Sequence, residues 1–108
     1  MSTKHFAPTL AQPIAVCGVR FDHADYDAGG DLLYLTKGMP LGPADGDTPE
    51  GHTVFLGEKD RVICLLINRP RQLLNRHGAI EVTLRAGGST TRLAREAVEP
   101  LLVETRRY

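Results

Sequence analysis

The sequence predicts a single small α+β domain with a mostly antiparallel sheet of about five strands, two hairpins first, and one or two helices on one face. Three observations lead to this prediction. A chain of 108 residues can form one domain with a modest core. Two apolar segments in the first two thirds of the chain fold back at acidic, Gly-containing turns, as β-hairpins do. Two later segments carry helix caps and stop signals.

The chain is expected to begin with an arm and to continue as one domain. Residues 1–13 contain two prolines and little periodicity, so they are predicted to lack a core of their own. The domain is predicted to span 14–108. Residues 14–26 are rich in β-forming side chains and predict the first strand, with Gly18 marking a bulge.

An acidic turn and a return strand complete the first predicted hairpin. Residues 27–31 read DAGGD, and their glycines tolerate the positive φ angles of tight turns. Residues 32–38 carry large apolar side chains on both faces, which is typical of a central or covered strand. Residues 39–51 are rich in proline and glycine and predict the longest loop of the domain.

The second predicted hairpin supplies the centre of the sheet. Its first strand lies around residues 54–56, its turn reads GEKD, and the returning strand at 61–67 is nearly all apolar. A helix is predicted over 68–78, because Asn68 is a good N-cap and Gly78 a good C-terminal stop.

The last quarter of the chain is expected to hold one more strand and a final helix. Residues 79–84 alternate between apolar and polar side chains, which predicts a half-buried strand. A glycine-rich loop follows, and Thr90 or Thr91 is expected to cap a helix over 92–108. Pro100 is expected to end or kink this helix.

Charge and targeting features argue against several classes of function. Lys and Arg together number 13, as do Asp and Glu, so no global basic field favours nonspecific binding to nucleic acid or an anionic membrane. No segment is apolar enough for a signal peptide or a membrane span, which favours a cytoplasmic protein. Cys17 and Cys64 are then expected to be reduced, buried thiols. No sequence motif indicates a cofactor-binding site.

Two motifs within residues 19–67 are shared with a known family. The matching positions are Tyr26, Asp27, Asp31, Leu33, Tyr34 and Leu35 in the first motif and Asp60, Arg61, Val62 and Ile63 in the second. In these motifs the chain resembles the small bacterial proteins of domain-of-unknown-function family 2283. The resemblance implies a compact β-rich domain with a helix and no established activity. Some members of the family look like the antitoxin halves of toxin–antitoxin pairs.

The acidic hairpin has two interpretations. If residues 21–27 form a strand, then His23, Asp25 and Asp27 share one face. With His52 from the following loop they would offer nitrogen and oxygen ligands to a metal ion. Aspartate is also a common turn residue that accepts hydrogen bonds from local backbone N–H groups. We favour the turn interpretation.

Basic residues gather in the two predicted helices. The candidate positions for a nucleic-acid or partner surface are Arg69, Arg71, Arg92 and Arg95. If both helices lie on one face of the sheet, these side chains would form a basic patch. No set of stacking aromatic residues accompanies them, so nucleic-acid binding is not favoured.

These observations are compatible with three functions. We favour a non-enzymatic, antitoxin-like interaction module whose terminal arms bind a protein partner, such as a toxin-like protein. A small enzyme or metal-binding protein that uses the His and Asp group is the second, and a nucleic-acid accessory protein is the third. A homodimer is expected, because a small sheet that is apolar on both faces leaves surface for a second copy to cover.

Overall fold

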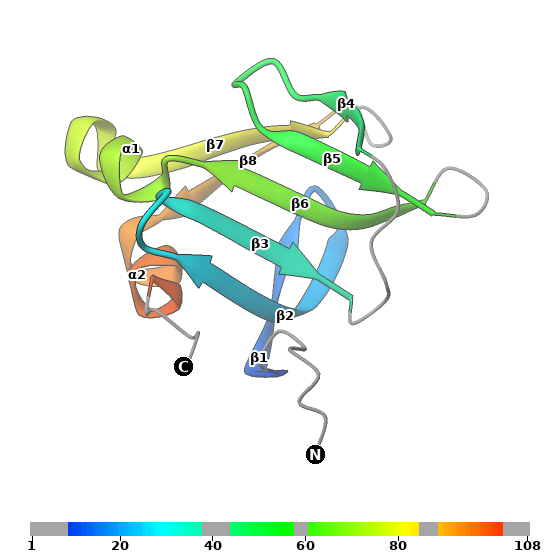
Figure 1. The fold of residues 1–108 in the computed structure, drawn as a ribbon, viewed down its shortest axis with the longest axis horizontal. Coiled ribbons are helices and arrows are strands. Elements are labelled where there is room, and N and C mark those ends of the chain that lie inside the picture. Colours follow the sequence, from blue (N-terminus) through cyan, green and yellow to red (C-terminus); the bar gives the residue numbers. More distant parts are fainter. Residues whose placement is uncertain (1–8, 38–43, 58–60, 85–88, 103–108) are drawn as a thin grey trace.

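A six-stranded antiparallel sheet dominates the structure, a computed structural model that describes residues 9–37, 44–57, 61–84 and 89–102 (Figure 1). Its strands are β1 (Thr9–Val16), β2 (Val19–Asp27), β3 (Leu32–Thr36), β4 (Ala44–Asp47), β5 (Thr53–Leu56) and β6 (Val62–Asn68). In space they follow the order β1-β2-β3-β6-β5-β4, and each neighbouring pair is antiparallel. The apolar strand β6 therefore lies inside the sheet, as predicted.

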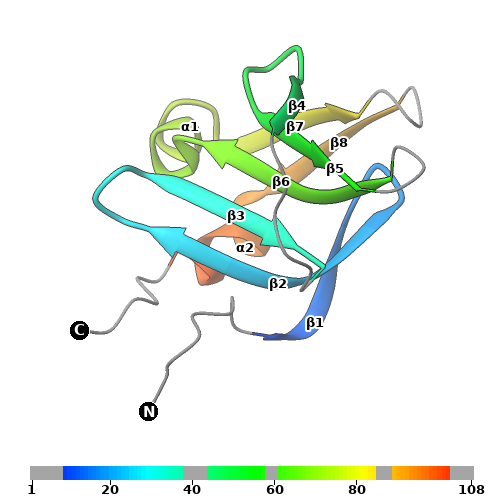
Figure 2. The same ribbon diagram turned by 45° about the vertical axis from the view of Figure 1, so that its right-hand side comes forward.

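A second layer covers one face of this sheet. It contains α1 (Pro70–His77), β7 (Ala79–Leu84), β8 (Ser89–Ala94), α2 (Arg95–Val98) and a 3₁₀ turn (Glu99–Leu101). Strands β7 and β8 pair with each other as a separate two-stranded sheet. Figures 1 and 2 show β7, β8 and α2 behind β2, β3, β6 and β5, whose other face is turned toward the viewer.

The core lies between the two layers. Leu33 and Leu35 of β3 and Leu65 and Ile67 of β6 are fully buried there. The second layer contributes inward side chains at alternate positions of β7. These are Ile80, Val82 and Leu84. The predicted alternation of this strand is confirmed, since Glu81 is exposed and Thr83 half-buried.

The predicted fold class is confirmed in broad terms, but the sheet is larger than expected. The predicted first strand is in fact two strands, β1 and β2, joined by a tight turn at Cys17 and Gly18. Both residues have positive φ angles, 52° and 82°. A two-residue hairpin turn of type I′ requires positive φ at both positions, and its twist matches the right-handed twist of the strands. Gly18 is therefore a turn residue and not a bulge.

Two predicted boundaries also differ from those in the structure. Strand β1 begins at Thr9, so residues 9–13 of the predicted arm belong to the sheet, and residues 1–8 lie outside the described residues. The predicted loop at 39–51 contains β4, while 38–43 is not described. The hairpins β2–β3 and β5–β6 form as predicted.

The predicted C-terminal helix over 92–108 is wrong in its first part. Residues 89–94 form strand β8, and only the short α2 and the 3₁₀ turn follow. β8 pairs with β7 in an unbroken register from Ala79 opposite Ala94 to Leu84 opposite Ser89. Pairing along this whole length outweighs the capping tendency of the threonines. Residues 103–108 lie outside the described part of the chain.

Helix α1 is close to its prediction, but its cap is different. It ends at Gly78, whose φ of 74° provides the left-handed C-cap that glycine favours. At its start, Asn68 does not cap it. The residue before the helix is Arg69, with a left-handed φ of 55° and no side-chain cap of its own. In the described residues neither helix is long and apolar enough to cross a bilayer.

Candidate functional site

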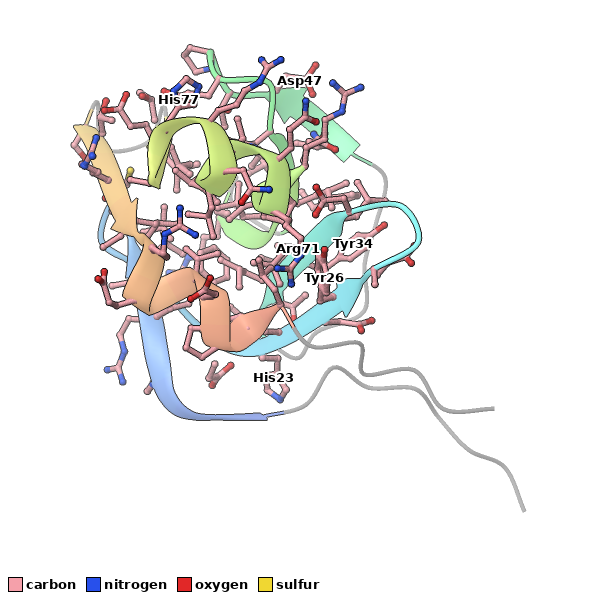
Figure 3. The ribbon with its side chains drawn as sticks, turned by 90° about the vertical axis from the view of Figure 1, so that its left-hand side faces the viewer. His23, Tyr26, Tyr34, Asp47, Arg71 and His77 are labelled. Atoms are coloured by element: carbon pink, nitrogen blue, oxygen red, sulfur yellow. The ribbon has the colours of Figure 1, made fainter. Side chains whose placement is uncertain are left out.

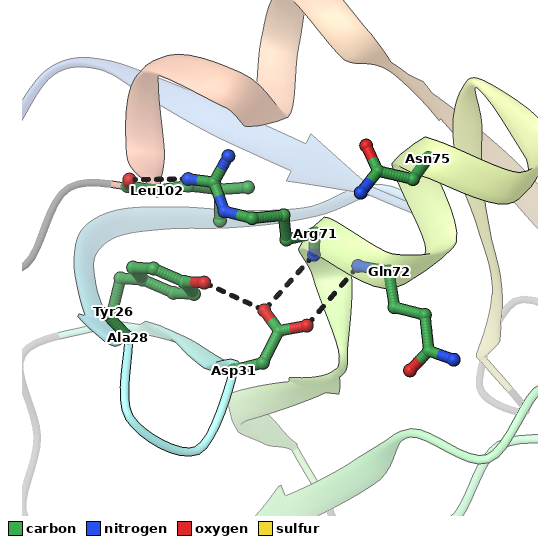
Figure 4. Close-up of a pocket in the computed structure, with 7 residues that line it drawn as sticks. All are labelled: Tyr26, Ala28, Asp31, Arg71, Gln72, Asn75 and Leu102. Carbon is green, nitrogen blue, oxygen red and sulfur yellow. Dashed lines mark hydrogen bonds between the residues drawn. The ribbon is translucent and has the colours of Figure 1, made fainter.

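The carboxylate of Asp31, in the β2–β3 turn, caps helix α1 (Figure 4). Its Oδ1 accepts hydrogen bonds from the Tyr26 hydroxyl at 2.8 Å and from the Arg71 backbone N–H at 3.2 Å. Its Oδ2 accepts from the Gln72 N–H at 3.3 Å. These N–H groups have no partner within the helix, and a negative charge is favourable at a helix N-terminus. Asp31 therefore joins the sheet to α1.

Asp27 has the turn role that the sequence suggests. Its Oδ1 accepts hydrogen bonds from the N–H groups of Gly29 at 3.1 Å and Gly30 at 3.4 Å. This is the local pattern by which aspartate stabilises turns. The two aspartates that flank the Gly-Gly pair are thus engaged with backbone, one locally and one across the fold.

A pocket of about 410 Å³ lies beside this cap. It is lined by Tyr26, Ala28, Asp31, Arg71, Gln72, Asn75 and Leu102. The Arg71 guanidinium lies 6.0 Å from the Tyr26 ring centroid and donates to the Leu102 carbonyl at 3.2 Å. Burial, followed by the hydrogen bond to Asp31, raises the pKa of Tyr26. These polar groups bind one another, so the cluster stabilises the joint between sheet and helices.

The predicted metal ligands do not come together. His23, Asp25 and Asp27 lie along β2, whereas His52 precedes β5 on the other side of β3 and β6. His23 Nδ1 is 2.8 Å from the Asp22 carboxylate. Among the described residues, no three His, Cys, Asp or Glu side chains are grouped so that they could hold a metal ion.

His52 is instead buried in a tight loop between β4 and β5. Its backbone N–H donates to Thr48 Oγ1 at 3.1 Å, and its carbonyl accepts from the Thr48 N–H at 2.7 Å. Its Nδ1 accepts a hydrogen bond from the Asn68 N–H at 3.2 Å, which places the proton of the neutral ring on Nε2. Nε2 is buried, and the backbone carbonyl of Glu81 is the acceptor that acts on it, without a hydrogen bond of good geometry.

Burial lowers the pKa of His52, although the charge of Glu50 and the carbonyl of Glu81 partly oppose the effect. The unfolded chain, with an ordinary value of 6.5, then binds a proton more readily than the folded one. The free energy of unfolding is therefore expected to fall as the pH drops below about 6.5 toward the folded pKa. Urea unfolding between about pH 7.5 and pH 5.5 measures this slope.

The control for this prediction is a second histidine. His52→Asn retains an acceptor for the Asn68 N–H and removes the titrating ring, so its slope in this pH range is expected to be smaller. His77→Asn, at the exposed end of α1, is expected to leave the contribution of His52 unchanged. An unchanged slope in His52→Asn would refute the assignment.

Glu50, in the same loop, reaches across to the second layer. Its Oε1 accepts from the Thr83 N–H at 3.0 Å and its Oε2 from the Thr83 hydroxyl at 2.6 Å. Partial burial raises the pKa of this carboxyl, but the hydrogen bonds from Thr83 outweigh that effect and leave the pKa below its ordinary value. The loop thus connects the two sheets.

Two of the four candidate arginines are bound within the fold. Arg71 is bound to the Leu102 carbonyl, and Arg95 donates to the Leu74 carbonyl at 2.7 Å. Arg92 lies 3.8 Å from Glu81 across the β7–β8 pair. Arg69 occupies the position before α1. Arg71 and Arg95 therefore help to pack the helices.

We use the term outer face for the side of the six-stranded sheet away from β7 and β8. One row of paired residues crosses it, and directly paired residues point to the same side. The row is Asp25 (β2), Tyr34 (β3), Leu66 (β6), Thr53 (β5) and Asp47 (β4). In the view of Figure 3, Tyr34 and Asp47 lie to the right, while β8 lies to the left. Along this row the outer face is thus apolar at its centre and acidic at both ends.

The two cysteines differ in their surroundings. Both are free, and burial raises the pKa of the Cys64 thiol to about 12. Cys17 is only half-buried, and its Sγ lies 3.1 Å from the Ser89 carbonyl and 3.3 Å from the Val82 carbonyl. Its backbone N–H donates to Thr91 Oγ1 at 2.7 Å. The β1–β2 turn is therefore docked on the β7–β8 hairpin.

Comparison with protein-family models, with curated proteins and with solved structures finds no significant match for the chain.

Proposed function

We propose that this chain is a non-enzymatic protein-interaction module that binds its partner through the outer face. An apolar strip on that face carries the proposal. The strip consists of Leu32, Tyr34, Phe55 and Leu66, all half-buried and all outside the main core. The solvated face of an antiparallel sheet normally carries polar side chains. An apolar strip at this position is typical of a surface that a partner covers.

The charges around the strip favour a basic protein as that partner. Asp25 and Asp47 lie at opposite ends of the central row, with Tyr34 and Leu66 between them. A partner with an apolar centre and a basic rim complements this arrangement. A second copy aligned on the same row would set carboxylates against carboxylates, so we favour a different, basic protein over the homodimer expected from the sequence.

This surface replaces the terminal arms as the proposed binding element. Residues 9–13 belong to β1, and 1–8 and 103–108 lie outside the described residues. The resemblance to domain-of-unknown-function family 2283 supports the same proposal, because some of its members look like antitoxins. An antitoxin-like module that masks a small basic toxin is the specific form that we propose.

Co-purification with point variants tests this function. The tagged full chain is expressed in its native host, and co-purifying proteins are quantified by mass spectrometry. We expect one basic protein in a stoichiometric amount, bound more weakly as salt rises. Leu66→Lys places a charge at the centre of the strip and is expected to reduce recovery by at least about tenfold.

The control carries the same charge on another surface. Ala97→Lys alters an exposed apolar residue of α2, in the second layer, and is expected to leave recovery unchanged. Equal recovery with Leu66→Lys, or the absence of a stoichiometric partner, would contradict the proposal. A purified chain that is dimeric, and becomes monomeric with Leu66→Lys, would assign the outer face to a second copy instead.

A further inference from the structure

The four residues of the apolar strip follow a diagonal across the middle of the outer face. Tyr34 of β3 pairs with Leu66 of β6 in the central row. Leu32 precedes Tyr34 by two residues and lies on one side of this row. Phe55 of β5 lies on the other side, because it pairs with Cys64, two residues before Leu66. The strip therefore crosses three neighbouring strands obliquely, from β3 through β6 to β5.

Sheet geometry sets the length of the strip. Leu32 and Phe55 are two strands apart across the sheet and four residues apart along the strand direction. With about 4.8 Å between strands and about 3.4 Å per residue, their Cα atoms are about 17 Å apart. An α-helix covers this distance in about 11 residues, and a fully extended chain covers it in about five.

The strip is narrow, and polar residues lie on both of its sides. On the outer face its neighbours are Asp25 of β2 and Thr36 of β3 on one side, and Thr53 of β5 and Asp47 of β4 on the other. A second sheet packs through a broad apolar face. An amphipathic helix docks through a narrow apolar stripe that has polar or charged residues beside it. The width of the strip therefore matches a helix.

The acidic residues indicate the charge of that helix. Asp47 is exposed, and Asp25, at the other end of the central row, is half-buried. Because the strip runs diagonally, one of these carboxylates lies on each side of it. Lys or Arg on both flanks of the apolar stripe of a helix complements this arrangement.

We propose that the partner contributes a basic amphipathic α-helix of about three turns, which lies diagonally across β3, β6 and β5. Its apolar residues, at helical spacing, contact the strip from Leu32 to Phe55. Its basic residues lie opposite Asp25 and Asp47. This inference rests on the proposed function, because it names the element that the outer face binds.

Photo-cross-linking of the complex in the native host measures the spacing directly. The photoreactive residue p-benzoylphenylalanine replaces Leu32 in one version of the tagged full chain and Phe55 in another, both half-buried surface positions. Mass spectrometry then locates the cross-linked residues of the partner. We expect both versions to label one partner segment, at sites about 11 residues apart. Sites about five residues apart, or in two separate segments, would overturn the helix and leave the outer face as the binding surface.

A third version serves as the control. It carries the photoreactive residue at Ala97, which is exposed in the second layer, and is expected to label no partner. Recovery of the partner with each version, checked before irradiation, establishes that the fold tolerates the replacement. Cross-links from neither Leu32 nor Phe55 in a complex that still forms would contradict the outer face itself, and the helix with it.

A charge variant tests the same model without altering the strip. Asp47→Asn is expected to weaken the complex about threefold and to make its dissociation less sensitive to salt, because one ion pair at the rim is lost. Glu96→Gln removes an equal charge from the exposed side of α2 and is expected to change neither property. Equal effects of the two variants would contradict a basic residue of the helix opposite Asp47.

Discussion

Leu65→Ala is expected to lower the free energy of unfolding by about 2–5 kcal/mol. Leu65 is fully buried on the inner face of β6, where it pairs with Leu35 and Val54 on the neighbouring strands. Its truncation removes apolar contacts from the core between the two layers and leaves a cavity that the sheet can only partly fill. Urea unfolding followed by circular dichroism measures the loss.

The adjacent residue of the same strand provides the control. Leu66 points to the outer face and is half-buried, so Leu66→Ala is expected to cost only about 1 kcal/mol. Similar losses at the two positions would contradict the assignment of one face to the core and the other to a partner. A small loss for Leu66→Ala would also establish that Leu66 can be altered in binding experiments without loss of the fold.

Asp31→Ala is expected to destabilise the protein by about 2–4 kcal/mol, because it removes the cap of α1 and the partner of a buried tyrosine. The Tyr26 side chain is 3% exposed, and its hydroxyl donates to Asp31. Asp31 also has a φ of 55°, which alanine adopts less readily than aspartate. Thermal or urea unfolding measures the effect.

A double-mutant cycle separates these contributions. Tyr26→Phe alone is expected to cost about 1 kcal/mol, and much less in the Asp31→Ala background, because the shared hydrogen bond is already lost. Asp27→Ala, which removes only a local turn contact, is expected to cost about 0.5–1 kcal/mol. Equal costs at Asp27 and Asp31 would show that the helix cap contributes little.

Local signals in the sequence were sufficient for the hairpins β2–β3 and β5–β6 and for α1. Turn residues, apolar runs and the glycine at the end of α1 act within a few residues, so they can be interpreted without a structure. The C-terminal quarter was harder to predict, because threonine suits both a helix cap and a strand. Pairing between β7 and β8 decided the outcome, and the sequence alone does not reveal that pairing.

The candidate sites depend even more on long-range contacts. The turn role of the aspartates could be predicted, but the contact between Asp31 and α1 joins residues 40 positions apart. A pocket of about 370 Å³ beside His52 draws its groups from three separate segments, and the metal-site hypothesis grouped His52 with residues from the wrong strand. The only sequence signal for this pocket was the outward position of Glu81 in an alternating strand.

The most direct test of the central proposal is hydroxyl-radical footprinting of the chain, alone and in the complex purified from its host. If the outer face binds the partner, labelling of Tyr34 and Leu66 is expected to fall in the complex, while that of Leu101, in the second layer, is expected to remain unchanged. Unchanged labelling of Tyr34 and Leu66 in a stoichiometric complex would contradict the outer face as the binding surface.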